Sequence, residues 1–343
     1  MAESGAMTNR EHKDERVNGE EAIIRLLAPL ARGAPGAFGL EDDCALIAPA
    51  PGTELVLKTD PVAEGVHFLA DDAPEDIAWK ALAVNVSDLA AKAARPLGYL
   101  MALSFSEAPA AAWLARFAAG LQAAQATFGC HLLGGDTDRR PGPLTISITV
   151  IGEVEAGRLV RRGTARPGDA LFVSGSLGDA ALGLALRKDR ALAERWGLSP
   201  DEVRHLRNRY ARPQPRLGLG LALRTHAAAA MDVSDGLAKD LARMCKASAC
   251  AARVRLSELP LSPAAAKALA ADPDLGLRTV TGGDDYELLA SVPEASADAF
   301  GAMAAQAGIA VTRIGTTSVG AGVVIEDQDG QPLTLDRAGW DHF

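Results

Sequence analysis

Cysteine and aromatic residues are scarce in this chain. Only four cysteines occur among 343 residues, and no two of them form a CxxC pair. This number and spacing argue against a zinc ribbon and against a secreted scaffold held by disulfides, and they favour a reducing compartment. Aromatic residues make up 4% of the chain, whereas alanine and glycine are abundant. Such a composition favours mixed α/β packing through small side chains.

The sequence also lacks an excess of positive charge and a long apolar run. Its formal net charge is -9, and Lys and Arg form no basic stripe, so we expect no nucleic-acid partner. Nowhere do eighteen apolar residues follow one another, and the polar first twenty residues contain no apolar signal region. We therefore expect no membrane span, no membrane partner and a cytoplasmic location.

Several catalytic motifs are missing as well. The chain contains neither GxSxG nor HExxH, and its glycine-rich segments match neither GxGxxG nor the P-loop pattern. These absences remove support for nucleophilic hydrolysis, for zinc chemistry and for the common nucleotide-binding loops. The chemistry that the sequence still supports is metal binding by the oxygen atoms of carboxylates.

Hydrophobic periodicity predicts helices that alternate with strands. Expected strands cover residues 54–59, 99–105, 131–133, 144–154, 170–173 and 227–233. Expected helices cover residues 20–31, 73–94, 109–127, 177–188 and 237–248. The predicted fold class is therefore α/β, of the α+β type.

A segment rich in Arg, Gly and Pro, RRGTARPGD at residues 161–169, separates two apolar runs and predicts a domain junction. We expect a disordered tail over residues 1–19, an N-terminal domain over 20–164 and a C-terminal domain over 165–343.

Six short segments place carboxylates at the ends of apolar runs or within them: LEDDCA, KTDPVAEGVHF, VNVSDLAA, LLGGDTD, MDVSDG and GGDDYEL. Each has an ordinary explanation by itself, because acidic residues at strand ends and turns form Asx turns or helix caps. Together they supply hard oxygen ligands of the kind that hold magnesium beside phosphates: Asp43, Asp60, Asp88, Asp136, Asp232 and Asp235.

Asp88 interrupts an expected helix whose other positions, from Ala78 to Ala91, are almost all apolar. A carboxylate buried there needs a partner. The sequence leaves two explanations open, an ion pair with Lys92 at i+4 or a metal ligand that faces a cleft.

The segments LLGGD and AMDVSDG share one design. An apolar strand delivers Asp136, or Asp232 and Asp235, to a turn that glycine makes permissive, so that a phosphate can approach closely. The helix expected from Leu237 could add backbone amides as an anion site. Ordinary helix capping by Ser234 or Asp235 explains the same pattern.

These segments, in this order, resemble the thiamine-monophosphate kinase family of the aminoimidazole ribonucleotide synthetase superfamily. The likeness runs from LEDDCALI through KTDPVAEGVHF, WKALAVNVSDLAAKAARP, GGDT, RPGD, SGSLGDAALGL, RPQPR, MDVSDGL and GGDDYEL to WDHF. It implies an architecture similar to that of aminoimidazole ribonucleotide synthetase, with an N-terminal domain that dimerises through its sheet and a C-terminal α/β domain. It also implies a homodimer that uses ATP and several magnesium ions to convert thiamine monophosphate to thiamine diphosphate. We expect direct in-line transfer, because the acceptor phosphate is already ionised.

The resemblance further implies roles for single residues. The positions that match magnesium ligands are Asp43, Thr59, Asp60, Asp88, Asp136, Asp232 and Asp235, of which Asp88, Asp136 and Asp232 are expected to be catalytic. The positions that match ATP contacts are Gly135, Asp136, Arg162 and Ser234. The positions that match contacts to the thiamine phosphate are His67, Asp284 and Trp340. From the residues alone, Trp340 could equally anchor the C-terminus and His67 could be a solvated loop residue.

Three positions depart from the family pattern. Glu41 replaces a glycine of the GIGDD segment, Asp284 replaces a glutamate, and Lys58 stands where some relatives have a serine that offers a further metal contact. We expect an altered backbone at Glu41, an altered substrate contact at Asp284 and one more loosely bound ion near Lys58.

Two other functions stay open. One is another ATP-using enzyme of the superfamily, such as an aminoimidazole ribonucleotide synthetase-like ligase, against which GGDDYEL and WDHF argue. The other is an ATP-binding regulator without catalysis, which the intact set of acidic residues disfavours.

Overall fold

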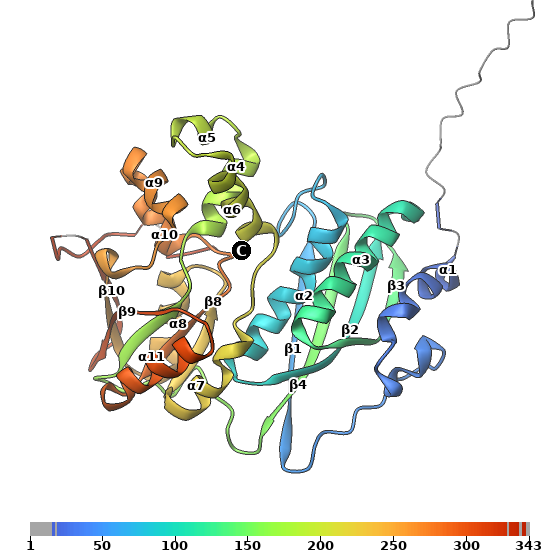
Figure 1. Ribbon diagram of the computed structural model, residues 1–343, viewed down its shortest axis with the longest axis horizontal. Helices are drawn as coiled ribbons and strands as arrows, with labels where there is room; N and C mark the ends of the chain where they lie inside the picture. Colours follow the sequence, from blue (N-terminus) through green and yellow to red (C-terminus); the bar gives the residue numbers. More distant parts are fainter. Residues whose placement is uncertain (1–15, 18, 328, 336–337, 341–343) are drawn as a thin grey trace, which may run out of the picture.

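Two β-sheets, each with its own helices, lie side by side in the computed structural model (Figure 1). The structure describes residues 16–17, 19–327, 329–335 and 338–340, so most of the tail predicted over residues 1–19 lies outside the described residues. Helix α1 (Glu20–Leu27) opens the fold. The predicted mixed α/β class with two domains is confirmed.

The N-terminal sheet has four strands in the order β1-β4-β2-β3. Their bounds are β1 (Thr53–Ala63), β2 (Arg95–Phe105), β3 (His131–Arg139) and β4 (Thr145–Glu155). Strand β4 pairs antiparallel with both β1 and β2, whereas β2 and β3 are parallel and joined by a helical crossover. Strands β1 and β3 therefore form the two edges of this sheet.

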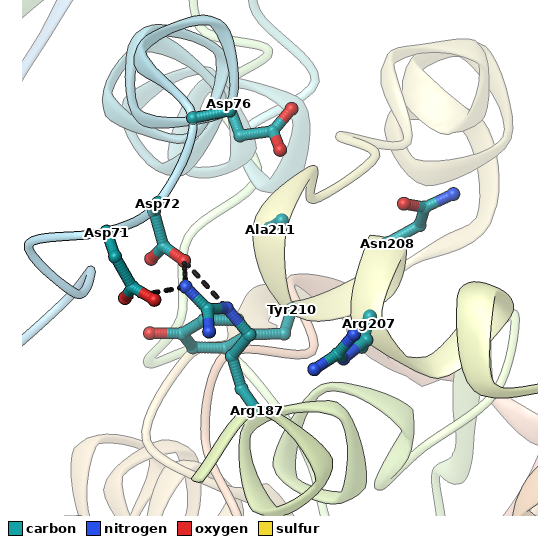
Figure 2. A pocket seen from close by; sticks show the side chains of 9 residues that line it. Asp71, Asp72, Asp76, Arg187, Arg207, Asn208, Tyr210 and Ala211 are labelled. Atoms are coloured by element: carbon teal, nitrogen blue, oxygen red, sulfur yellow. Dashed lines mark hydrogen bonds and ion pairs between the residues drawn. The ribbon is translucent and has the colours of Figure 1, made fainter. Parts of the chain in front are cut away.

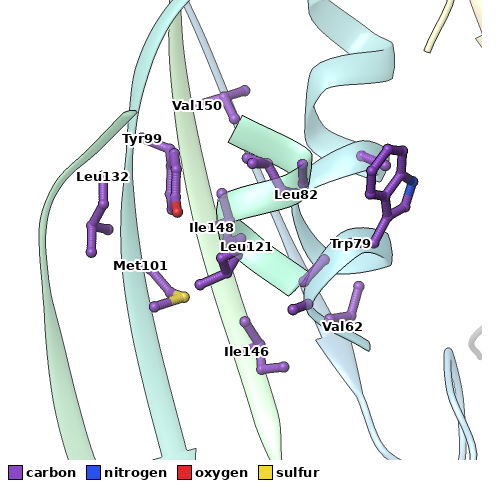
Figure 3. Packing of buried hydrophobic residues seen from close by; sticks show 14 of the residues in the cluster. Val62, Trp79, Leu82, Tyr99, Met101, Leu121, Leu132, Ile146, Ile148 and Val150 are labelled. Atoms are coloured by element: carbon purple, nitrogen blue, oxygen red, sulfur yellow. The ribbon is translucent and has the colours of Figure 1, made fainter. Parts of the chain in front are cut away.

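Two long helices, α2 (Pro74–Ala91) and α3 (Ala111–Phe128), cover one face of this sheet (Figure 1). Figure 3 shows Tyr99 and Ile148 of the strands packed against Leu82 of α2 and Leu121 of α3. Proline at the first position of α2, followed by two acidic residues, favours a helix start there. Almost every residue of α2 is buried, because the helix also contacts elements of the second domain.

The other face of the four-stranded sheet is only partly covered, by apolar residues of the segment 31–47 that pack on Leu133 of β3 and Ile151 of β4. Side chains alternate between the faces of a strand, so Leu55 and Leu57 of β1 point away from α2. They are 40% and 65% exposed, and Leu100 of β2 is 39% exposed. The rest of this outer face therefore carries partly exposed apolar side chains.

The C-terminal sheet has six strands in the order β10-β7-β9-β5-β8-β6. Their bounds are β5 (Ala170–Ser174), β6 (Ala229–Val233), β7 (Ala251–Arg255), β8 (Glu287–Val292), β9 (Val311–Ser318) and β10 (Gly322–Glu326). Only β10 and β7 pair in parallel. Strands β5, β6 and β8 are buried along their whole length, which fits helices on both faces.

Helix α8 (Leu237–Ser248) packs on one face of the six-stranded sheet, and α7 (Gly220–His226) and α11 (Ala297–Gln306) pack on the other. A further group of helices packs around Trp196 and Leu206: α4 (Asp179–Lys188), α5 (Leu192–Arg195), α6 (Pro200–Ala211) and α9 (Pro263–Ala271). Helix α10 (Gly276–Thr281) lies between this group and α8.

The predicted domain junction falls in the loop between β4, which ends at Glu155, and β5, which begins at Ala170. The exact boundary between the two domains, placed between residues 164 and 165, stays a prediction. Within the described part of the chain, no helix has the length and apolarity that a bilayer crossing requires.

Candidate functional site

Four of the predicted acidic residues meet where the two domains join. Asp60 lies on β1, Asp88 on α2, Asp232 on β6 and Asp235 in the turn after β6. Burial raises the pKa of Asp60, and the charges of Asp88 and Asp235 add to this rise; burial and then the charge of Asp88 raise the pKa of Asp232. The packing of α2 against β6 brings the two domains' carboxylates together.

Lys58 joins two of these carboxylates. Its Nζ lies 2.9 Å from Oδ2 of Asp88 and 3.1 Å from Oδ2 of Asp60. Burial alone would lower the pKa of Lys58, but the adjacent Asp88 and Asp60 outweigh burial and raise it. Lys92, the partner that the sequence offered for Asp88, instead donates to the carbonyl of Ala230, at 2.8 Å.

Asp232 is the most deeply buried member of this group, with 6% of its surface exposed. Burial, and then the negative charge of Asp88, raise the pKa of Asp232 to about 8. A carboxylate in this position is stable in its charged form only beside a cation.

Asp235 follows in a turn that several contacts fix. Its carboxylate lies 2.6 Å from Arg243 and 3.4 Å from Lys239, both on α8. Asp240 accepts hydrogen bonds from the backbone amides of Ser234 and Asp235, each at 2.9 Å. Helix α8 starts after Gly236 and has no side-chain cap. The helix cap by Ser234 or Asp235 that the sequence allowed is therefore not observed. Within the chain, these two amides already have an acceptor.

Asp284 lies in a second group, formed with Lys80 and Tyr210. Lys80 Nζ is 3.1 Å from Oδ2 of Asp284 and 3.7 Å from the centre of the Tyr210 ring. Burial lowers the pKa of Lys80, and the nearby Asp284 opposes this. The Tyr210 hydroxyl donates to the carbonyl of His67 at 3.2 Å, and Nδ1 of His67 accepts from the Ala63 amide at 3.1 Å. Two predicted substrate residues, His67 and Asp284, are thus connected through Tyr210 and Lys80.

Trp340, the third predicted substrate residue, lies beside the acidic turn. Its backbone amide donates to the carbonyl of Asp235 at 3.0 Å, and its carbonyl accepts from Lys239. The side chain is still half-exposed. The segment WDHF continues into residues 341–343, which lie outside the described residues.

The remaining predicted residues are not part of this group. Thr59 lies on the opposite face of β1 from Asp60, and its hydroxyl donates to the Ile148 carbonyl at 3.1 Å. Gly135 and Asp136 lie on β3, the other edge of the sheet, three strand spacings or roughly 14 Å from β1. Asp43 lies in an exposed loop before β1, and Arg162 lies in the loop between β4 and β5. The single chain therefore assembles only part of the predicted site.

Comparisons with known proteins match this architecture. The family models described as AIR synthase related protein, N-terminal domain and C-terminal domain, match residues 41–154 and 166–328. A thiamine-monophosphate kinase from Caulobacter vibrioides is 44% identical over 323 residues, which cover 93% of this chain and 89% of the relative. The chain belongs to the thiamine-monophosphate kinase family.

Solved structures agree with this assignment. The thiamine-monophosphate kinase of Stenotrophomonas maltophilia K279a is 39% identical, with a TM-score of 0.81 over 93% of this chain and 99% of that one. The structure described as AaThiL complexed with AMPPCP and TMP is 32% identical, with a TM-score of 0.74 over 95% of this chain and 97% of that one.

Sequence reasoning missed four residues that support the site in this member of the thiamine-monophosphate kinase family. They are Lys80, Tyr210, Asp285 and Glu287. Asp285 is buried and accepts from the amides of Gly178, at 2.8 Å, and Ala180, at 3.3 Å, so it holds the start of α4. Lys80, Asp285 and Glu287 stand within the motifs WKALAVNVSDLAA and GGDDYEL, and a buried charge inside an apolar run was the signal that could have found them.

Glu287 ties the GGDDYEL segment to two arginines. Its fully buried carboxylate lies 2.8 Å from Arg209 and 2.5 Å from Arg216, and it accepts from the Ser174 hydroxyl at 2.5 Å. The RPQPR segment, in which Arg216 stands, is therefore held against β8. This network fixes the start of β8, the strand that pairs with β6.

A charged pocket of about 200 Å³ lies beside Tyr210 (Figure 2). The loop residues Asp71 and Asp72 of the first domain form ion pairs there with Arg187 of α4, at 2.7 and 2.8 Å. Tyr210 also lines the pocket, but none of the predicted site residues does. We attribute it to the contact between the domains, because its carboxylates already have arginine partners.

The carboxylates at the domain junction are of the kind that binds a hard divalent cation. Asp60 and Asp88 offer carboxylate oxygens to a single cationic nitrogen, and Asp232 lies close enough to respond to the charge of Asp88. No group of three or more His, Cys, Asp or Glu among the described residues is arranged to hold a metal by itself. One or two carboxylates can still bind magnesium, which takes water and substrate phosphates as its other ligands.

Proposed function

We propose that this protein transfers the γ-phosphoryl group of ATP to thiamine monophosphate and so makes thiamine diphosphate. The observation that carries the proposal is the meeting of Asp60, Asp88, Asp232 and Asp235 at the domain junction of a chain 44% identical to a thiamine-monophosphate kinase. The relative solved with AMPPCP and TMP supports both substrates.

Asp60 and Asp88, through the carboxylate oxygens that Lys58 does not contact, would hold magnesium together with Asp232, with Asp235 at the same edge. Bound magnesium would screen the charge of the two phosphate groups and so let them approach each other. The buried position of Asp232 supports this role, because its carboxylate lacks solvation and gains from a nearby cation. The ion pairs of Asp235 with Arg243 and Lys239 would keep its turn in place.

The substrate side would be formed by Asp284, His67 and Trp340. Lys80 and Tyr210 orient Asp284 and His67, because each makes a direct contact to one of them. The half-exposed indole of Trp340 would lie against a cationic thiazolium ring, an interaction that aromatic faces favour. Transfer would be direct, without a phosphoenzyme, since the acceptor phosphate needs no strong base.

Asp43, Thr59, Gly135, Asp136, Arg162 and Ser234 remain proposals for the metal and ATP side. A homodimer formed through the partly exposed outer face of the N-terminal sheet would bring a second copy close to two of these residues. Leu57 and Leu100 expose apolar surface on the face that also carries Thr59 and Asp136, so a second copy packed there would enclose both. A cytoplasmic location is supported by the four cysteines, all of which are free thiols.

The test is a product assay on the purified full-length chain. The protein is incubated with ATP, magnesium chloride and thiamine monophosphate, and thiamine diphosphate is quantified after oxidation to its fluorescent thiochrome form. We expect product that disappears when a chelator is added. ATP binding without product would refute the proposal and would favour a superfamily ligase with another acceptor, or a regulator.

A further inference from the structure

A lysine occupies the space between two of the proposed metal ligands. The ammonium of Lys58 contacts Asp88 on α2 and Asp60 on β1 at the same time, at 2.9 and 3.1 Å. Within the part of the chain that the structure describes, Lys58 is the only basic residue in ion-pair contact with either carboxylate. The single positive charge of Lys58 therefore forms an ion pair with both carboxylates.

The register of β1 produces this contact. Lys58 and Asp60 are two residues apart, so their side chains lie on the same face of the strand, toward α2. The backbone amide of Asp60 donates to Oδ1 of Asn85 on α2 at 2.8 Å, which fixes the distance between strand and helix. The Lys58 side chain is 33% exposed and that of Asp88 is 27% exposed, so the pair is partly shielded from water.

An ammonium and a magnesium ion exclude each other at this pair of oxygens. An ammonium nitrogen stands about 2.7–2.9 Å from a carboxylate oxygen, whereas magnesium binds its oxygens at about 2.0–2.1 Å. A metal placed between Asp60 and Asp88 would therefore have to displace Lys58. Displacement would leave a lysine charge beside a divalent cation, which is electrostatically unfavourable.

We propose that the ammonium group of Lys58 takes the place of one divalent cation at the Asp60–Asp88 pair, so that this enzyme binds one metal ion fewer than it would with a small neutral residue at position 58. The inference rests on the proposed function only in that Asp60 and Asp88 are taken as metal ligands. The neighbouring carboxylate of Asp232, for which no ion pair is seen among the described residues, stays available for the metal ions that accompany ATP.

A purely structural ion pair is the competing explanation. In that case Lys58 would leave the pair when metal and nucleotide bind, and the number of bound metal ions would not depend on residue 58. Stability alone cannot separate the two explanations, because both lose an ion pair when Lys58 is replaced. The number of metal ions separates them.

The experiment counts bound Mn²⁺ on the full-length chain in the presence of AMPPCP, from the electron paramagnetic resonance signal of free Mn²⁺. We expect Lys58→Ser to bind one more Mn²⁺ per chain than the natural protein. Lys58→Arg keeps the positive charge and should bind the natural number. Lys188→Ser removes an exposed lysine at the end of α4 and serves as the matched control, with no change expected.

Circular dichroism verifies that each variant is folded. If Lys58→Ser does not fold, Lys58→Gln, which keeps most of the side-chain length without the charge, is counted in its place. Equal Mn²⁺ numbers for the natural protein and a folded uncharged variant would overturn the inference. The count uses no turnover. A natural protein that makes no thiamine diphosphate would refute the proposed function, whereas a gain of one Mn²⁺ in Lys58→Ser would still support this inference.

Discussion

Replacing Asp88 by Asn separates the chemistry of the site from its contribution to folding. The substitution keeps the shape of the side chain and removes one negative charge. Lys58 retains its second partner, Asp60, at 3.1 Å. A partly exposed ion pair contributes about 0.2–1 kcal/mol, and loss of the Asp88 charge also relieves repulsion of the buried Asp232. We therefore expect the free energy of unfolding to change by less than about 1 kcal/mol.

The effect on activity should be far larger. A metal that contacts reacting phosphate groups supplies several kcal/mol of transition-state stabilisation, and each 1.36 kcal/mol corresponds to about tenfold in rate. Loss of one of its carboxylates should lower kcat/KM for thiamine monophosphate by about 100-fold to 10,000-fold. The thiochrome assay measures kcat/KM, and urea denaturation measures stability.

Asp76→Asn is the matched control. Asp76 lies in the first turn of the same helix, α2, and its carboxylate, 30% exposed, is 2.5 Å from Arg212. It therefore resembles Asp88 in exposure and in pairing, but it lies away from the acidic group. We expect Asp76→Asn to keep activity within about threefold of the natural protein. Similar activities of the two variants, or a loss of more than 3 kcal/mol of stability in Asp88→Asn alone, would refute the reasoning.

Three further predictions follow from the same contacts. Glu287→Gln leaves the buried Arg209 and the half-buried Arg216 without a counter-charge, so urea denaturation should show a loss of about 3–5 kcal/mol, and a loss below 1 kcal/mol would contradict this account. Burial raises the pKa of Asp285 to about 8, so the folded state holds a proton that the unfolded state releases near pH 4. Stability measured in chelator should therefore fall as the pH rises from 5 to 8, less steeply in Asp285→Asn, and equal slopes would count against the buried proton. Leu57→Asp should convert a dimer to a monomer in sedimentation experiments, whereas Leu221→Asp, at a similarly exposed position on α7, should not; a monomeric natural protein would exclude the dimer proposal.

Much of the fold could be read from local patterns. The expected strand at residues 54–59 became β1, and the expected helices at 73–94 and 237–248 became α2 and α8. Long apolar runs and strict alternation are local properties of a sequence, so they survive folding. Strand β3, expected over residues 131–133, extends to Arg139, because pairing with β2 continues through residues that are polar.

The site was only partly accessible to the same reasoning. The motifs identified the carboxylates, but not which of them meet, since Asp60 and Asp136 fall on opposite edges of one sheet. The alternatives for Asp88 were limited to residues nearby in the sequence, such as Lys92. Its ion-pair partner proved to be Lys58, on another element.

The sequence by itself determined the fold class, the two-domain order, the acidic motifs and the family, because each depends on residue type and spacing along the chain. Tertiary packing decided the rest. It placed Lys58 between Asp60 and Asp88, and it brought Lys80 within 3.1 Å of Asp284 across the domain junction. Residues so far apart in sequence meet only when α2 packs against both sheets, and no local pattern encodes that contact.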